Sequence, residues 1–318
     1  MDAHRALLTI RDVADGVPPR ESGARRSPIA LRHFSGHLAH SERLTSSIKV
    51  AHLTDQHFGV VTPMAIQRLA VQLTNAERPD IVVLTGDFVA HSHAYLDALT
   101  DALARLHAPA YAVLGNHDHW SGADDVRRAL ARAGVCVLDN AHTVIEVRGE
   151  RLAIVGVDDA YTGHCDVERA VKGLDRALPV IGLSHIGEVA DRLWSEGVPL
   201  VFSGHTHAGQ VTVARLHELA VGKLAGHKYV HGLYGDRRAI GAVYVGAGIG
   251  ASVMPLRVGE RGRREVAVFD LGSAPGSLVE HHIEQPPLPG RAPTEAHVQR
   301  RHAAAKKKAA RRTRADRA

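Results

Sequence analysis

Residues 48–57 read IKVAHLTDQH, a short apolar run that stops at a group of polar side chains. Such a run, followed directly by Thr-Asp-Gln-His, predicts a buried β-strand that ends in a polar turn. The same arrangement returns further along the chain. Six apolar runs predict strands of this kind: Ile48–Leu53, Ile81–Leu84, Ala110–Leu114, Leu152–Val157, Val180–Leu183 and Leu200–Phe202.

Amphipathic stretches separate several of these runs and predict helices. One begins at Thr62 and Pro63, which suit the N-cap and the first helical position. A second, over residues 96–106, places four leucines on one face. A third runs from about Asp124 and stops before Gly134, a typical residue after a helix end. Strands that alternate with helices indicate an α/β fold with a mainly parallel core.

The composition is that of a folded, soluble protein. Of 318 residues, 45% are hydrophobic and 23% are charged, which supports a sizeable core. We find no apolar run of 18 residues and no signal peptide at the N-terminus, and therefore expect a cytoplasmic protein without a transmembrane segment. Two cysteines cannot form a disulfide framework.

The chain divides into three parts by composition. Residues 1–46 lack a sustained pattern and predict a loosely ordered N-terminal arm, whereas residues 47–272 contain all the strand and helix patterns. Within the latter, residues 241–270 predict a sheet that finishes in hairpins. Residues 273–318 predict a linker rich in Pro and Gly, followed by a tail rich in Lys and Arg.

The positive charge of the protein belongs to this tail. Residues 296–318 contain three Lys, six Arg and one Asp, a net charge of +8, while the whole chain carries only +5. The remaining residues therefore carry about −3. Two interpretations of the tail stay open: a solvated end without a partner, or a contact with an anionic membrane or a nucleic acid. Contact with a membrane would make the protein peripheral there.

Five of the six apolar runs lead into side chains that can bind a metal. Ligand sites in open α/β sheets form at the carboxyl ends of strands, so these five segments can converge. The candidate ligands are Asp55, His57, Asp87, Asn116, His185, His205 and His207, and the last four strand ends read GD (86–87), GNHD (115–118), SH (184–185) and GHTH (204–207).

The types of ligand indicate the kind of metal. Carboxylate oxygens mixed with imidazoles suit Mn, Fe, Zn or Co. Seven ligands are too many for one tetrahedral ion and suit two ions that share a carboxylate. Glycines precede three of the ligands, at Gly86, Gly115 and Gly204, where a larger residue would hinder a tight turn or close approach.

With these motifs in this order, the chain resembles the calcineurin-like metallophosphoesterases over roughly residues 47–272. The resemblance implies a four-layer α/β/β/α sandwich of two mixed sheets flanked by helices, with a dinuclear metal site at the strand ends. It implies that the first ion is bound by Asp55, His57 and His207, the second by Asn116, His185 and His205, and both by Asp87. It also places His117 near the scissile phosphate, with Asp118 supporting it.

A narrower resemblance concerns the C-terminal half of this region. Residues 205–210 (HTHAGQ), 231–234 (HGLY), 244–250 (YVGAGIG) and 255–257 (PLR) are similar to a branch of small, often membrane-associated phosphodiesterases. That branch usually has Gly at the position of Ala208 and Asn-Pro in place of residues 186–187. Neither difference removes a ligand.

The expected reaction is hydrolysis of a small phosphate mono- or diester by a hydroxide that bridges two cations. His117 would donate a proton to the leaving oxygen, and Asp118 would favour the protonated imidazole. Two alternatives stay open: a metal-dependent nuclease that uses the basic tail, and a non-catalytic scaffold that retains the metal site. His119 and Trp120 are candidates for the substrate wall, and Asp158-Asp159 for a turn or cap outside the ligand set.

Overall fold

The computed structural model describes most of the region between residues 27 and 272. The predicted linker and basic tail, 273–318, and the first 26 residues of the predicted arm lie outside the described part. Described are residues 27–36, 43–209, 226–235, 241–251, 257, 259 and 262–272.

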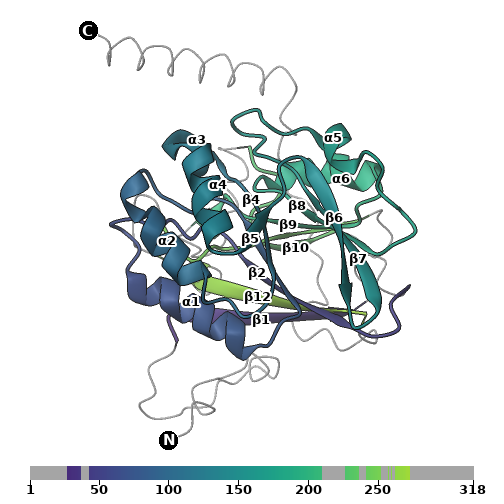
Figure 1. Ribbon diagram of the computed structural model, residues 1–318, viewed down its shortest axis with the longest axis horizontal. Helices are drawn as coiled ribbons and strands as arrows, with labels where there is room; N and C mark the ends of the chain where they lie inside the picture. Colours follow the sequence, from purple (N-terminus) through teal and green to yellow (C-terminus); the bar gives the residue numbers. More distant parts are fainter. Residues whose placement is uncertain are drawn as a thin grey trace, which may run out of the picture.

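In these described residues, twelve strands form two six-stranded mixed sheets (Figure 1). Most neighbouring strands are parallel, and the antiparallel pairs are β12 with β2, β10 with β11 and β6 with β7. In spatial order, the first sheet contains β1 (Ile29–Gly36), β12 (Arg264–Leu271), β2 (Ile48–Leu53), β3 (Ile81–Thr85), β4 (Ala110–Val113) and β5 (Val135–Val137). The second contains β10 (Gly232–Tyr234), β11 (Ala242–Val245), β9 (Leu200–Ser203), β8 (Val180–Leu183), β7 (Glu150–Gly156) and β6 (Ala141–Val147).

Helices cover the outer face of each sheet. Apolar residues of α1 (Met64–Ala76), α2 (Leu96–Leu103) and α4 (Ala123–Arg132) pack on the first sheet, and those of α5 (Val167–Val171) and α6 (Ala190–Ser195) pack on the second. The short helix α3 (Asn116–Ser121) follows β4. Single 3₁₀ turns occur at His93–Tyr95, Gly187–Val189 and His207–Gly209. In the described part of the chain, each helix is too short or too polar to cross a membrane.

The alternation of side chains along each strand explains the four layers. On β2, Ile48 and Val50 face the core between the two sheets, while Ala51 and Leu53 face the helices. Successive side chains of a strand point to opposite faces, so a strand that is apolar on both faces must be covered on both. This arrangement confirms the expected α/β/β/α sandwich.

The predicted strands match the observed ones closely, and the predicted helix ends match in part. Gly134 follows α4 with φ +79°, as expected for a glycine after a helix end. The predicted cap of α1 is wrong, because Pro63 occupies the N-cap position and no side chain caps the helix. Thr62 instead joins the loop before α1 to Ala251, whose backbone N–H donates to the Thr62 hydroxyl over 3.0 Å.

The predicted hairpins at the end of the domain are also corrected. β11 pairs antiparallel with β10, but β12 does not pair with β11 and belongs to the other sheet. The chain therefore changes sheets between β11 and β12, and connects the two halves of the sandwich.

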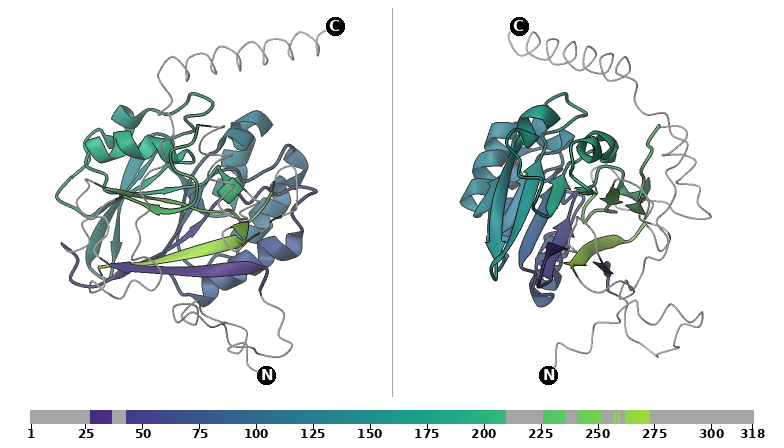
Figure 2. Two further views of the ribbon diagram at one scale, coloured as in Figure 1. Left: turned by 180° about the vertical axis from the view of Figure 1, so that it is seen from behind. Right: turned by 90° about the vertical axis from the view of Figure 1, so that its right-hand side faces the viewer.

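One part of the predicted arm is a strand of the first sheet. β1 pairs in parallel with β12 along its whole length, from Ile29 opposite Arg264 to Gly36 opposite Leu271, as the purple and yellow-green strands of Figure 2 (left) show. The Phe34 ring is 2% exposed and stacks on Phe269 with 4.3 Å between ring centroids. Because the partner strand is far away in sequence, the local pattern did not reveal β1.

Phe34→Ala tests whether β1 is part of the stable fold. We expect the free energy of unfolding to fall by about 3–5 kcal/mol, as for other buried phenylalanines. Val60→Ala, at a side chain that is 88% exposed, is the control and should change stability by less than about 0.5 kcal/mol. Both values follow from denaturant unfolding curves. Equal stability of the two variants would show that β1 is only loosely attached.

Candidate metal centre

Six of the seven predicted ligands lie together where the strands of the two sheets end. Their donor atoms form groups in which all members lie within 4.8 Å of one another, close enough to bind a common ion. A further histidine, His117, joins one group. The three groups are Asp55, His57 and His207; His57, Asp87 and His117; and Asp87, His185 and His205.

Asp87 connects the groups. Its Oδ2 atom lies 3.5 Å from His57 Nε2 and 3.4 Å from His185 Nε2. Its Oδ1 atom accepts a hydrogen bond of 2.8 Å from the backbone N–H of His117, which fixes the carboxylate relative to α3. One carboxylate therefore faces histidines from both sheets.

Hydrogen bonds to the backbone orient His185 toward Asp87. His185 Nδ1 lies 2.7 Å from the Thr85 carbonyl oxygen, so this nitrogen donates and Nε2 faces the site. His205 Nδ1 lies 3.3 Å from His185 Nε2. A carbonyl that binds the far nitrogen of a histidine in this way is typical of metal ligands.

Burial keeps most of these imidazoles neutral, the form that binds metals. Burial lowers the pKa of His57 and of His207 to about 3 and that of His205 well below its usual value. Burial also opposes protonation of His185, but the adjacent Asp87 carboxylate outweighs it and raises the pKa of His185 to about 10. The Asp87 carboxylate thus favours positive charge beside His185.

Two further observations fit a metal. His57 Nε2 and His207 Nε2 lie only 3.0 Å apart, so two lone-pair donors point at nearly the same place. Asn116 is 2% exposed, and its Oδ1 atom is buried without a hydrogen-bond partner in the described part of the protein. An unpaired buried oxygen is costly, and a cation ligated by that oxygen would remove the cost.

The backbone is strained at the predicted ligands. Five of the seven have φ between +44° and +72°, the left-handed region that residues other than glycine rarely adopt. Strain of this kind persists only where the surrounding structure enforces it, and is common at functional sites. The five residues are Asp55, His57, Asp87, His205 and His207.

Two of the predicted glycines are required by close packing. A Cβ atom on Gly204 would overlap Thr54 Oγ1 and Asp55 Oδ2, and one on Gly115 would overlap the backbone nitrogen and carboxylate of Asp87. Each glycine thus lets one strand end approach a ligand on another.

His117 lies at the edge of the cluster, where a substrate can reach it. Its Nδ1 atom lies 2.6 Å from the Ala90 carbonyl oxygen and its Nε2 atom 4.0 Å from Asp87 Oδ2. Its ring contacts Trp120 edge to face, with 4.9 Å between centroids. Trp120 is 52% exposed, consistent with its prediction as part of a substrate wall.

Asp118 does not support His117 in the way the sequence suggested. Its carboxylate accepts hydrogen bonds from the backbone N–H groups of Phe88, Val89 and Gly115, and the Ala90 carbonyl takes the expected place beside His117 Nδ1. Burial and the charge of Asp87 raise the pKa of Asp118 to about 7. Asp118 holds the loops after β3 and β4 together.

His119 was predicted as part of the substrate wall, and the structure does not place it there. His119 Nε2 lies 2.8 Å from Asp158 Oδ1, and the His119 side chain is only 8% exposed. This ring packs into a network of charges behind the site, and Trp120 alone of the two faces outward.

Arg257 lies next to the cluster, and the sequence motifs gave this residue no role. Its Nη2 atom lies 3.3 Å from His207 Nδ1, and its Nη1 atom donates to the Ala247 carbonyl over 2.7 Å. Burial lowers the pKa of Arg257 to about 10. The guanidinium thus places a positive charge behind the group of Asp55, His57 and His207. No local sequence pattern around Arg257 predicts this contact.

Comparisons with known proteins agree with this geometry. A family model described as calcineurin-like phosphoesterase matches residues 48–209. Phosphodiesterase YaeI of Escherichia coli (strain K12) is 30% identical over 249 residues, which are 76% of this chain and 87% of that protein. The metallophosphoesterase YkuE of Bacillus subtilis (strain 168) is 28% identical over 231 residues, 71% of this chain and 79% of that protein.

A transmembrane protein with a metallophosphoesterase domain from Danio rerio is 29% identical over 234 residues, 68% of this chain and 52% of that protein. Among solved structures, a dimetal phosphatase from Danio rerio is 14% identical with a TM-score of 0.40, and the match covers 71% of this chain and 99% of that one.

Gly204→Ala tests the close approach of the strand ends. The added Cβ must displace Thr54 and Asp55, so we expect loss of metal content and a fall in unfolding free energy of about 1–3 kcal/mol. Gly149→Ala is the control: Gly149 has φ +82° but no neighbouring atoms within 4 Å of the added carbon. The control should bear only backbone strain and keep its metal. Metal analysis and thermal unfolding give both readouts, and normal metal content in Gly204→Ala would contradict the packing argument.

Proposed function

This chain belongs to the calcineurin-like phosphoesterase family and is a metal-dependent phosphoesterase, and we propose that its active centre is the cluster around Asp87. The proposal rests above all on one observation: Asp87 Oδ2 lies within 3.5 Å of imidazole nitrogens from two separate groups of ligands. One group would hold each of two cations. Asp55, His57 and His207 would bind the first, Asn116, His185 and His205 the second, and Asp87 both.

The donor set limits the identity of the metal. Imidazole and carboxylate donors without thiolates suit Mn, Fe, Zn and Co, and none of the three groups among the described residues contains a cysteine. When bound, the two cations would polarise the phosphoryl oxygens and activate a water.

His117 would assist departure of the leaving group. The Ala90 carbonyl holds Nδ1, which leaves Nε2 directed to the side of the cluster near Asp87. A protonated Nε2 can donate to an oxygen that departs from phosphorus, a contribution of roughly 10²–10⁴-fold. The exposed Trp120 ring beside it provides an apolar surface for the organic part of the ester.

A phosphodiester is the substrate class that we favour. The relative from Escherichia coli is named a phosphodiesterase and shares 30% of aligned residues over most of both chains. Turnover of bis(4-nitrophenyl) phosphate and of 4-nitrophenyl phosphate, each with Mn²⁺ or with a chelator, tests this directly. We expect faster hydrolysis of the diester and loss of both activities with the chelator. Activity on the monoester alone would contradict the proposed class.

Asp87→Asn should weaken the binding of both cations at once. The amide keeps the shape of the side chain but removes the charge that both groups of ligands share. Metal analysis after dialysis should therefore find less than one ion per chain. Asp101→Asn, at an exposed position on α2 outside the three groups of ligands, is the matched control and should retain two ions. A variant of Asp87 with two tightly bound ions would rule out the shared role.

His117→Ala should retain metal but lose turnover, because this side chain is assigned to the substrate. The loss should be smaller for nitrophenyl esters than for alkyl esters, since nitrophenolate leaves without a proton. Rates for both ester types, measured with metal content confirmed, give the comparison. Equal losses for the two types would show that His117 positions the phosphate and is not an acid.

The basic tail is the proposed contact with anionic partners. We expect removal of residues 296–318 to leave turnover of small esters nearly unchanged, because all assigned ligands lie between Asp55 and His207. Removal of a charge of +8 should reduce binding to anionic vesicles and to RNA, with a flatter dependence on salt. Co-sedimentation at low and high salt measures both partners. Equal binding by both proteins would exclude the tail, and lost turnover would show that it packs on the catalytic domain.

A further inference from the structure

The loop after β7 runs beside the ligands proposed for the second cation. β7 and β8 are parallel, with Gly156 opposite Leu183, and the Val157 N–H donates to the Leu183 carbonyl over 3.0 Å. Continuing both strands by two residues brings Asp158 and Asp159 next to His185. This loop therefore starts at the same edge as the metal centre.

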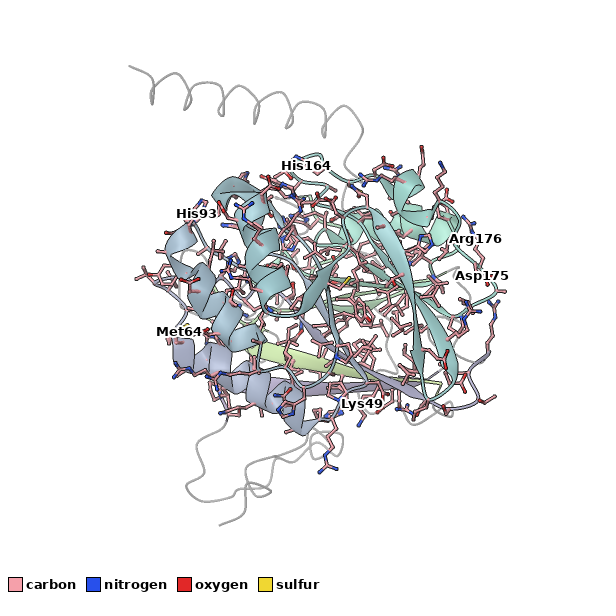
Figure 3. All side chains as sticks on the ribbon, viewed as in Figure 1. Lys49, Met64, His93, His164, Asp175 and Arg176 are labelled. Atoms are coloured by element: carbon pink, nitrogen blue, oxygen red, sulfur yellow. The ribbon has the colours of Figure 1, made fainter. Side chains whose placement is uncertain are left out.

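The same loop then passes over the other histidine of that group. The Tyr161 ring lies 5.5 Å from the His205 ring, centroid to centroid. His164, labelled in Figure 3, lies at the upper edge of the molecule and stacks on His119 at 4.1 Å. The loop of residues 158–164 thus passes His205, a ligand of the second group, and His119 beside the site.

Asp159 lies in this loop and is fully buried, with 0% of its surface exposed. Its Oδ2 atom accepts a hydrogen bond of 2.6 Å from the Thr162 backbone N–H. Its Oδ1 atom is buried and has no hydrogen-bond partner among the described residues. Burial raises the pKa of Asp159 despite the opposing effect of His185, and the Asp87 charge raises it further. The pairing of β7 with β8 places Asp159 in the loop beside that of His185.

The carboxylate of the adjacent Asp158, in contrast, has basic partners. Asp158 lies 2.8 Å from His119 Nε2 and 3.1 Å from Arg127 Nη2. Asp159 has no such ion pair in the described part of the protein. Burial of a carboxylate with an unpaired oxygen is unfavourable. Asp159 therefore lowers the stability of the fold in a way that Asp158 does not.

We propose that Asp159 is a positioning residue of the second metal site, formed by Asp87, Asn116, His185 and His205. Its unpaired oxygen accepts a hydrogen bond from a water or substrate hydroxyl held there, and its charge increases the affinity for a cation. This inference rests on the proposed function. Asp159 acts from outside the ligand set, because none of its described contacts is with a ligand atom.

Asp159→Asn tests the proposal, because asparagine keeps the size and can still accept from Thr162. Titration of the metal-free full-length protein with Mn²⁺ by calorimetry gives the affinity of each site. We expect one of the two affinities to fall roughly 10–100-fold, as for other residues that support metal ligands, and the other to change less than about twofold. Thermal unfolding of the metal-free variant should occur at the wild-type temperature or above, because the removed charge was unpaired.

Asp158→Asn is the matched control, one residue away. It breaks the contacts with His119 and Arg127, so we expect lower unfolding temperatures with and without Mn²⁺ and unchanged affinities. The two neighbouring variants thus separate a role in metal binding from a role in folding.

Three results would overturn the role of Asp159. The first is that Asp159→Asn binds Mn²⁺ at both sites with wild-type affinity. The second is that the unfolding temperature of Asp159→Asn is lowered equally with and without Mn²⁺. The third is that neither Asp159→Asn nor Asp159→Ala folds when Mn²⁺ is present. Wild-type protein that binds fewer than two Mn²⁺ ions would instead contradict the proposed function, so the two failures are distinguishable.

Discussion

Nitrogen atoms of several histidines crowd around one oxygen of Asp87, where the strands of the two sheets end. Three imidazole nitrogens, from His57, His185 and His117, lie between 3.4 and 4.0 Å from Asp87 Oδ2. Buried lone pairs at such distances repel one another unless protons or cations lie between them. Positive φ angles at five predicted ligands show that the backbone is held in this arrangement against its own preference. The fold thus enforces the arrangement of these side chains.

The rest of the sandwich holds the two sheets in the register that this crowding requires. Glu265 on β12 accepts hydrogen bonds from the Tyr244 hydroxyl and the Ala247 N–H, at 2.7 and 2.8 Å, and so connects the first sheet to the second. The loop that begins at Ala247 continues to Gly250, whose N–H donates to the Asp55 carbonyl over 2.7 Å. The buried Glu265 carboxylate is thus connected to a predicted ligand through one short loop.

Local sequence patterns were sufficient to predict the positions of the strands that carry the ligands. Each of these strands is apolar on both faces and ends in a glycine or polar turn, so strand position and ligand position appear together in the sequence. Because parallel strands present their carboxyl ends at one edge, convergence of the ligands followed from the α/β pattern alone.

What local patterns could not predict depends on contacts between distant residues. β1 has Arg32 and His33 within it and pairs with a strand more than 200 residues away. The role of Asp118 depends on which backbone amides surround it, and that of Arg257 on a loop that returns to His207. Asp159 differs from Asp158 only in what faces each carboxylate, and adjacent identical residues carry no sign of that difference.

The central claim is that two cations share the Asp87 carboxylate. Anomalous diffraction from crystals of the Mn²⁺-loaded protein measures this directly, since each bound ion gives its own peak. We expect two peaks about 3.5–4 Å apart, with an Asp87 oxygen within about 2.0–2.2 Å of each. A single peak, or two peaks of which only one contacts Asp87, would contradict it.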